Sequence, residues 1–277
     1  LDFLVVQINV FLFYIKHVTS DDTVIINTLL PFGAALAAKL KGADVIYYFH
    51  ESYIRPVSLF KFLFFIARIS ASKVIFVSLS LKRELPETDI ESVVIHNALP
   101  LDFVKKDLVV KKGKEFSVFM ACSLKSYKGV DVFVELSQRL KNIEFVIVLN
   151  AEPDEFKAFK SLNSHIENLS VYPKQSNLHS FYTRADLVLN LTNPEVCIES
   201  FGLTILEGMS YGVPAVAPRV GGSTEIISDT IDGFLINPSE INEIVNVINM
   251  LSEDVQYWNA LSRHALDKSR EFSYFFY

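Results

Sequence analysis

Residues 199–225 read E-S-F-G-L-T-I-L-E-G-M-S-Y-G-V-P-A-V-A-P-R-V-G-G-S-T-E, and this pattern predicts a loop, a helix, a strand and a second loop. Gly202 precedes an apolar segment with helical periodicity, and Gly212 and Pro214 end that segment. A short β-branched run follows, and then a pair of glycines. An alternation of this kind is typical of an α/β sheet in which a loop meets a ligand.

The same stretch indicates the chemistry of that ligand. Gly202 lets the backbone approach a ligand closely, and the N–H groups at the start of the predicted helix favour a phosphate or a diphosphate. Glu199 and Glu207, with seven residues between them, need another explanation, because carboxylates repel phosphate. Carboxylates accept hydrogen bonds from hydroxyl groups. The predicted ligand is therefore a phosphate joined to sugars.

The sequence on both sides of this stretch continues the alternation. We expect strands at 116–121, 145–149, 169–172, 186–190, 215–217 and 234–236. We expect helices at 130–140, 156–163, 177–184, 239–251 and 254–268, the fourth capped by Ser239. Strands that alternate with helices predict a parallel, doubly wound sheet.

A second set of elements precedes residue 100. Strands are expected at 22–27, 44–49, 73–77 and 92–95, and helices at 1–15, 34–41, 59–69 and 80–85. A charged segment at 100–113 separates the two sets, so we place the domains at 1–103 and 104–277. Two such sheets that face each other leave a cleft between their strand ends, where His50 would lie.

Composition narrows the function classes. Half of the 277 residues are hydrophobic and 21% are charged, which indicates a folded chain. The formal net charge of −6 argues against a nucleic-acid partner. Two cysteines, Cys122 and Cys197, fit a reducing compartment. With no basic flank before the short apolar segment 1–15, a signal peptide and a membrane span are both disfavoured, and we expect a cytoplasmic protein.

Two apolar helices have alternative interpretations. We expect the helix at 1–15 to be buried in a core. The helix at 59–69 is rich in aromatic residues, and it carries Lys61 and Arg68 seven residues apart on one face. Core packing is favoured for this second helix, and contact with a membrane surface is the alternative.

The stretch 199–217, followed by G-G-S-T-E-I-I and D-G-F-L-I, closely resembles the nucleotide-sugar site of the family 4 glycosyltransferases, which have the two-domain GT-B fold. The segment L-K-S-Y-K-G-V-D-V-F at 124–133 resembles the loop that bears the family's donor-phosphate lysine. The segment V-I-Y-Y-F-H-E at 45–51 is similar to a strand end in the first domain, and the resemblance covers about residues 20 to 270.

The resemblance implies a role for each matching residue. Glu199 would accept hydrogen bonds from the donor sugar, Glu207 would hold the ribose hydroxyls, and Lys128 would add a positive charge at the diphosphate. The diphosphate would also meet the backbone amides of Phe201, Gly202 and Leu203. His50 would approach the transferred sugar from the opposite domain. The Lys128 ammonium and these backbone amides are set in place before the reaction and would stabilise the charge on the leaving diphosphate. Neither a metal nor another cofactor is therefore expected.

Each of these residues also has a purely structural interpretation. The two glutamates could be surface acids, Lys128 a surface lysine at a helix start, and His50 a histidine satisfied at a strand end. The Gly221-Gly222 pair could be an ordinary turn.

The chain departs from the family pattern at two places. Ser123 stands where the family carries an arginine at the diphosphate, and Lys125 is a candidate substitute. The family also has a first strand, a glycine-rich loop and a final crossing helix for which we find no counterpart, so we expect a shortened first domain. Its exposed apolar surface could bind a membrane or a second copy of the chain.

The leading hypothesis is a retaining glycosyltransferase that moves a sugar from a nucleotide-diphosphate donor to a sugar or lipid-linked acceptor, in cell-surface polysaccharide or glycoconjugate synthesis. A nucleotide-sugar 2-epimerase is the alternative within enzymes. A non-catalytic subunit that binds a nucleotide sugar is the alternative outside them, and Ser123 favours it.

Overall fold

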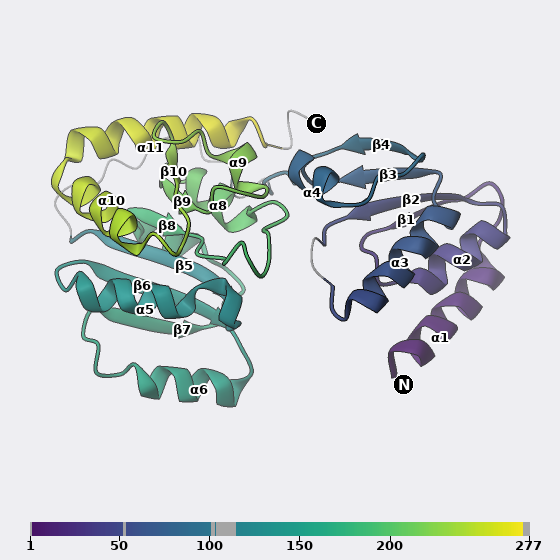
Figure 1. The fold of residues 1–277 in the computed structure, drawn as a ribbon, viewed down its shortest axis with the longest axis horizontal. Helices are drawn as coiled ribbons and strands as arrows, with labels where there is room; N and C mark the ends of the chain where they lie inside the picture. The colour runs from purple at the N-terminus through teal and green to yellow at the C-terminus, as the bar shows by residue number, and fades with distance from the viewer. Residues whose placement is uncertain (1, 52–53, 101–102, 104–114, 274–277) are drawn as a thin grey trace. The chain divides into compact units, whose positions relative to one another are not determined.

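A computed structural model describes residues 2–51, 54–100, 103 and 115–273 of the chain (Figure 1). The chain divides into two compact units, Leu1–His96 and Asn97–Tyr277. Most of the charged segment predicted to separate the domains lies outside the described residues. The boundary placed between residues 103 and 104 therefore stays a prediction, as does the cleft between the two sheets.

The first unit carries a parallel sheet of four strands in the order β1-β2-β3-β4. Its elements are α1 (Asp2–His17), β1 (Thr23–Ile26), α2 (Phe32–Leu40), β2 (Asp44–Phe49), α3 (Val57–Ser70), β3 (Lys73–Phe76), α4 (Leu79–Glu84) and β4 (Glu91–Val94). The strands are rich in valine and isoleucine, which suit a pleated and partly buried surface. Helix α2 is rich in alanine, and Ala35, Ala37 and Ala38 are fully buried within the unit.

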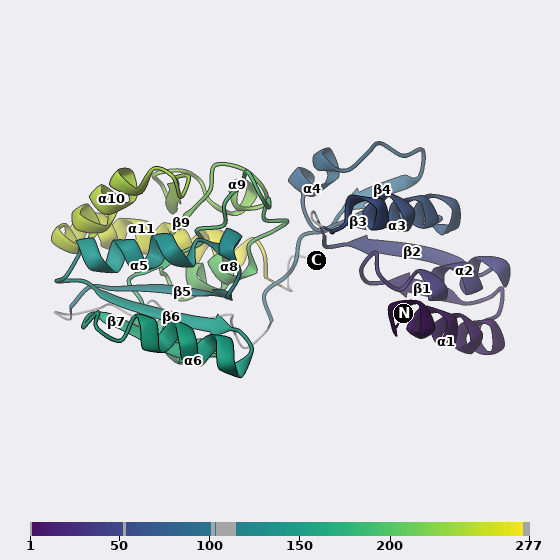
Figure 2. The same ribbon diagram turned by 60° about the horizontal axis from the view of Figure 1, so that its bottom comes forward.

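The prediction that the N-terminal helix is buried in a core is wrong. Helix α1 forms where expected, but it is not buried, since Gln7 is its one buried residue among those described. Leu4, Ile8 and Phe13 are each more than half exposed. The helix lies beside α2 in Figures 1 and 2, and a Cβ on Gly33 would lie 2.2 Å from the carbonyl oxygen of Gln7. Helix α1 is apolar on all sides, but it packs along one side only.

The aromatic helix α3 packs in the core as favoured. Leu63, Phe64 and Ile66 are buried, whereas Phe65 and Ile69 on the other side are exposed. Contact of this exposed side with a membrane stays a prediction. No helix among the described residues is long and apolar enough to span a membrane.

The second unit carries a parallel sheet of six strands in the order β10-β9-β8-β5-β6-β7. Its elements are β5 (Ser117–Ser123), the 3₁₀ helix η2 (Ser126–Lys128), α5 (Val130–Arg139), β6 (Glu144–Asn150), α6 (Pro153–Leu162), β7 (Leu169–Pro173), α7 (His179–Arg184), β8 (Leu187–Leu189), α8 (Leu203–Met209), β9 (Ala215–Ala217), α9 (Ser223–Ile226), β10 (Gly233–Leu235), α10 (Ile241–Glu253) and α11 (Val255–Arg270). Strand order reverses between β5 and β8. The predicted doubly wound sheet is confirmed.

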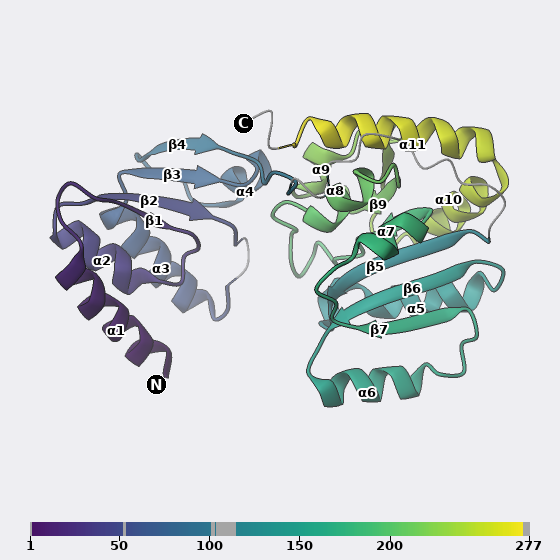
Figure 3. The ribbon, with the colours of Figure 1, turned by 180° about the vertical axis from the view of Figure 1, so that it is seen from behind.

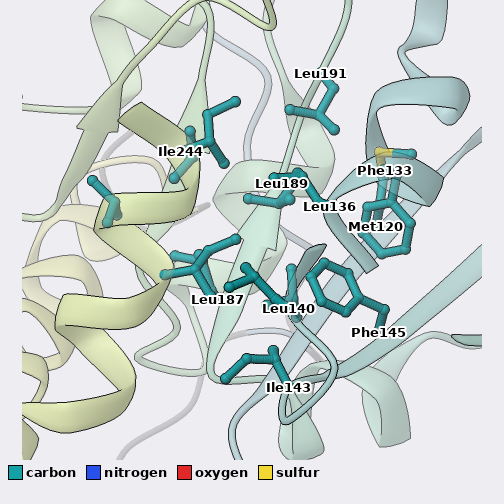
Figure 4. Packing of buried hydrophobic residues seen from close by; sticks show 14 of the residues in the cluster. Met120, Phe133, Leu136, Leu140, Ile143, Phe145, Leu187, Leu189, Leu191 and Ile244 are labelled. Atoms are coloured by element: carbon teal, nitrogen blue, oxygen red, sulfur yellow. The ribbon is translucent and has the colours of Figure 1, made fainter. Parts of the chain in front are cut away.

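The core of this unit lies on both faces of the sheet. Figure 4 shows Phe133 and Leu136 of α5 packed with Met120, Phe145 and other strand residues. Helices α5 and α10 lie on this face in Figure 1, and α7 lies on the opposite face in Figure 3. On that opposite face, a Cβ on Gly208 of α8 would lie 2.6 Å from Cγ2 of Val188 in β8. This close contact fixes α8 on the strand that precedes it.

The predicted Ser239 cap is wrong. Helix α10 begins at Ile241, and the residue at the cap position is Glu240, whose side chain makes no capping hydrogen bond. The carboxylate of Glu240 instead accepts a hydrogen bond of 2.9 Å from the backbone N–H of Asn237 and pairs with Arg219. These contacts hold the turn before the helix.

Candidate functional site

A pocket of about 220 Å³ opens at the carboxyl ends of β5 and β8. Cys122 and Ser123 line it from the end of β5, and Asn190 and Thr192 line it from the residues that follow β8. These are the two strands between which strand order reverses. The loops after two such strands lead to opposite faces of the sheet and so leave a crevice, which is where open α/β sheets bind ligands.

Close backbone packing holds the two loops together. Gly129 has a φ of +69°, a left-handed conformation that lets η2 turn directly into α5. A Cβ at this position would lie 2.2 Å from the carbonyl oxygen of Leu191. The backbone N–H of Asn193 also donates to the carbonyl oxygen of Tyr127 over 2.7 Å. The loop with Lys128 is thereby fixed against the loop that leads to Glu199.

Lys128 and Glu199 meet in this pocket. Nζ of Lys128 lies 2.8 Å from Oε2 of Glu199, and the two side chains are only 20% and 22% exposed. Burial opposes the charged form of the lysine, but the Glu199 carboxylate outweighs it and raises the pKa of Lys128. The lysine therefore stays charged around neutral pH.

Two further side chains hold the same carboxylate oxygen. The hydroxyl of Thr192 donates to Oε2 of Glu199 over 3.3 Å, and the amide of Asn190 does so over 3.4 Å. The side-chain oxygen of Asn190 in turn accepts the backbone N–H of Thr192 at 3.1 Å. We did not predict these two residues as part of the site. Their position directly after a buried strand was the available signal.

The glycine pair Gly221-Gly222 packs against the backbone of the loop that carries Glu199. The backbone N–H of Gly222 donates to the carbonyl oxygen of Glu199 over 2.8 Å. A Cβ on Gly221 would lie 2.5 Å from that same oxygen, and a Cβ on Gly222 would lie 2.3 Å from Cα of Phe201. The pair is thus more than an ordinary turn, because larger residues would displace the backbone that carries Glu199.

The residues at the start of α8 have different positions. Gly202 has a φ of +101° and is the residue before the helix, and Leu203 lines the pocket. Phe201 is buried, with its ring centroid 5.9 Å from that of Phe272. Glu207 lies further along α8, is half-buried, and accepts a hydrogen bond of 2.7 Å from the hydroxyl of Tyr182.

Two other polar groups near the pocket have limited chemistry. Burial raises the pKa of the Cys122 thiol to about 12, so this side chain is a neutral thiol at pH 7 and a poor nucleophile. Lys125 is exposed, and the residues that line the pocket do not include it. In this structure Lys125 therefore does not supply a cation to the pocket lining.

His50 belongs to the first unit, where it follows β2. Its Nε2 lies 2.8 Å from Oδ1 of Asn27, which follows the neighbouring strand β1. Burial lowers the pKa of His50, and Glu51 opposes this effect, so the imidazole is neutral at pH 7. Its predicted approach to the transferred sugar stays a prediction.

Comparison with known proteins gives relatives for most of the chain. A family described as "Glycosyl transferases group 1" matches residues 103–268. An uncharacterised glycosyltransferase of Methanocaldococcus jannaschii is 24% identical over 77% of this chain and 59% of its own length. The N-acetyl-alpha-D-glucosaminyl L-malate synthase of Bacillus anthracis is 26% identical over 62% of this chain and 44% of its own length. The chain thus spans about half the length of these two relatives.

A solved structure extends the likeness to both units. HepE of Anabaena, determined in complex with UDP-glucose, superposes with a TM-score of 0.81 at 20% identity, over 96% of this chain and 78% of its own. The chain has two α/β units with parallel sheets, and the second unit has a pocket where its strand order reverses. Together with the superposition on HepE, this confirms the predicted GT-B fold. The family match covers more than half of the residues. The chain belongs to the group 1 glycosyl transferases, and the predicted resemblance is confirmed at that level.

Proposed function

We propose that this chain acts as a retaining glycosyltransferase, which moves a sugar from a nucleotide-diphosphate sugar to a sugar or lipid-linked acceptor. The observation that carries the proposal is the Lys128–Glu199 pair in the pocket at the ends of β5 and β8. A lysine suits a diphosphate, and a glutamate suits sugar hydroxyls, so the two groups match the two parts of such a donor. The structure of HepE with UDP-glucose supports this class of donor.

The pair has a direct role in the chemistry of this proposal. In the transfer, the bond between the sugar and the diphosphate breaks, a bond between the sugar and the acceptor oxygen forms, and the acceptor hydroxyl gives its proton to an oxygen of the leaving diphosphate. The leaving diphosphate gains negative charge, which the Lys128 ammonium and nearby backbone N–H groups would stabilise. Lys128 would then exchange Glu199 for phosphate oxygens, while Asn190 and Thr192 continue to hold the carboxylate toward the sugar. The proposal includes no metal and no further cofactor.

The family resemblance supports the remaining roles. Glu207 would hold the ribose, His50 would act from the first unit, and the backbone at Phe201, Gly202 and Leu203 would meet the diphosphate. The cytoplasmic location and the synthesis of cell-surface polysaccharide or glycoconjugate are part of the same proposal. A nucleotide-sugar 2-epimerase would give a free epimerised donor instead of a linked product, which NMR of the product would distinguish.

Lys128→Met is expected to weaken UDP binding about 10- to 100-fold, since a hydrogen bond to a charged group contributes about 1.5–3 kcal/mol. Calorimetric titration with UDP and GDP measures the effect. Lys125→Met is the matched control, because that lysine is exposed and lies three residues away in sequence. Equal affinities in the two variants would remove Lys128 from the binding site.

Ser123→Arg is expected to strengthen UDP binding about tenfold, because it adds a second cation, able to bind two phosphate oxygens, to the pocket lining. Ser126→Arg makes the same change of charge at an exposed position of η2 and controls for long-range attraction. The same titration compares them. A gain of equal size at both positions contradicts a diphosphate beside Ser123.

The non-catalytic alternative has a specific observation in its favour, namely Ser123 at the arginine position. Tight binding of a nucleoside diphosphate without donor hydrolysis or transfer would establish that alternative. Measurable transfer by the wild-type chain would exclude it.

A further inference from the structure

The carboxylate of Glu207 is held by a tyrosine from another helix. Tyr182 lies on α7, is fully buried, and donates from its hydroxyl to Oε2 of Glu207 on α8 over 2.7 Å. The two residues are 25 positions apart in the sequence. The hydrogen bond therefore depends on α7 and α8 covering the same face of the sheet.

Neighbouring rings fix the Tyr182 side chain. The ring of Phe119 in β5 meets it edge-on with centroids 5.3 Å apart, and the ring of Tyr211 stacks on it at 5.8 Å. The hydroxyl of Tyr211 is itself engaged with Nδ1 of His179. A ring held by packed neighbours places its hydroxyl with little rotational freedom.

The hydroxyl is a permanent donor at neutral pH. Burial, and then the charge of Glu207, raise the pKa of Tyr182 well above its usual value. The phenol therefore keeps its proton, and its hydrogen bond to a carboxylate belongs to the stronger, charge-assisted class. One oxygen of Glu207 is thereby held in place, and a carboxylate has lone pairs for further donors.

We propose that Tyr182 is a positioning residue for nucleotide binding, whose hydroxyl sets the Glu207 carboxylate to accept hydrogen bonds from the ribose hydroxyls of a nucleoside diphosphate. The inference rests on the proposed function, which places the ribose at Glu207. It adds a residue from α7 to a site otherwise built from α8 and the loops after β5 and β8. The ligand feature that Tyr182 controls is the pair of ribose hydroxyls, and neither the base nor the diphosphate.

The test compares UDP with 2′,3′-dideoxy-UDP by calorimetric titration of the full 277-residue chain. The wild type is expected to prefer UDP. Tyr182→Phe is expected to weaken UDP binding about tenfold and to leave dideoxy-UDP binding unchanged, so the preference is lost. A purely structural role would weaken both ligands alike. If the wild type binds GDP and not UDP, GDP is compared with 2′,3′-dideoxy-GDP in the same way.

Two further variants separate this role from general packing. Tyr211→Phe removes the hydroxyl that pairs with His179 in the same ring cluster, and it is expected to keep the preference for UDP. Glu207→Gln alone should lose the preference for UDP. Adding Tyr182→Phe to it should cause little further loss, because the two substitutions act on the same interaction.

Different outcomes contradict the proposed function and the role of Tyr182. Failure of the wild type to bind UDP or GDP contradicts the proposed function, and the inference with it. UDP binding with no preference over dideoxy-UDP, an unchanged preference in Tyr182→Phe, or an equal loss in Tyr211→Phe contradicts the role of Tyr182 alone.

Discussion

Glu199→Gln is expected to reduce sugar transfer about 100- to 1000-fold, a loss typical of removing one group that stabilises a transition state. The amide keeps the shape of the side chain but loses the charge that meets the sugar. UDP binding is expected to be unchanged or tighter, because the substitution removes a negative charge near the diphosphate and frees Lys128 from its 2.8 Å ion pair. Transfer is expected to fall while UDP binding does not weaken, which separates this residue from one that only supports the fold.

A transfer assay and a UDP titration on the same preparation measure both effects. Glu195→Gln is the control, since it makes the same change at an exposed position in the same loop. Transfer that survives in Glu199→Gln, or an equal loss in Glu195→Gln, removes Glu199 from the catalytic site.

Gly129→Ala is expected to destabilise the second unit by about 2–5 kcal/mol, the sum of a left-handed backbone and an overpacked contact. The alanine methyl group would lie 2.2 Å from the carbonyl oxygen of Leu191, at a φ of +69°. Backbone cannot move aside as a flexible side chain can. The loops that carry Lys128 and Asn190 must therefore separate, and UDP binding should be lost together with stability.

Urea unfolding followed by the fluorescence of Trp258 measures this change, because the chain's one tryptophan is buried in the second unit. Gly42→Ala is the matched control: its φ is +77°, but the nearest atom to the added Cβ would be 3.7 Å away. Circular dichroism should show a smaller loss for this control, about 1–2 kcal/mol from the backbone alone. Equal losses in the two variants would show that the contact with Leu191 is not important.

Local patterns in the sequence were enough to predict the elements of both sheets. Strands such as Asp44–Phe49 and Ala215–Ala217 form where expected, because buried parallel strands are short apolar runs between polar ends. Helix α1 shows the limit of such patterns. A helix that is apolar on all sides is expected to pack against other parts of the protein. Its sequence does not show how many of its sides do so.

The site was predictable as a motif and not as an arrangement. The sequence indicated Glu199 and Lys128 separately, but their ion pair joins residues 71 positions apart. That contact depends on β5 and β8 being neighbours, which strand order decides. Tyr182 was missed because it lies on α7 and acts on Glu207 of α8. Asn190 was missed because the sequence does not show that the loop after β8 folds back and brings this side chain to Glu199, nine residues later.

The most direct test of the central claim is a calorimetric titration of UDP and GDP into the wild-type chain and Lys128→Met. A pocket built for the diphosphate of a sugar donor predicts saturable binding of at least one of the two nucleotides by the wild type. It also predicts that Lys128→Met weakens this binding about tenfold or more. No binding of either nucleotide, or equal binding by the wild type and the variant, would contradict it.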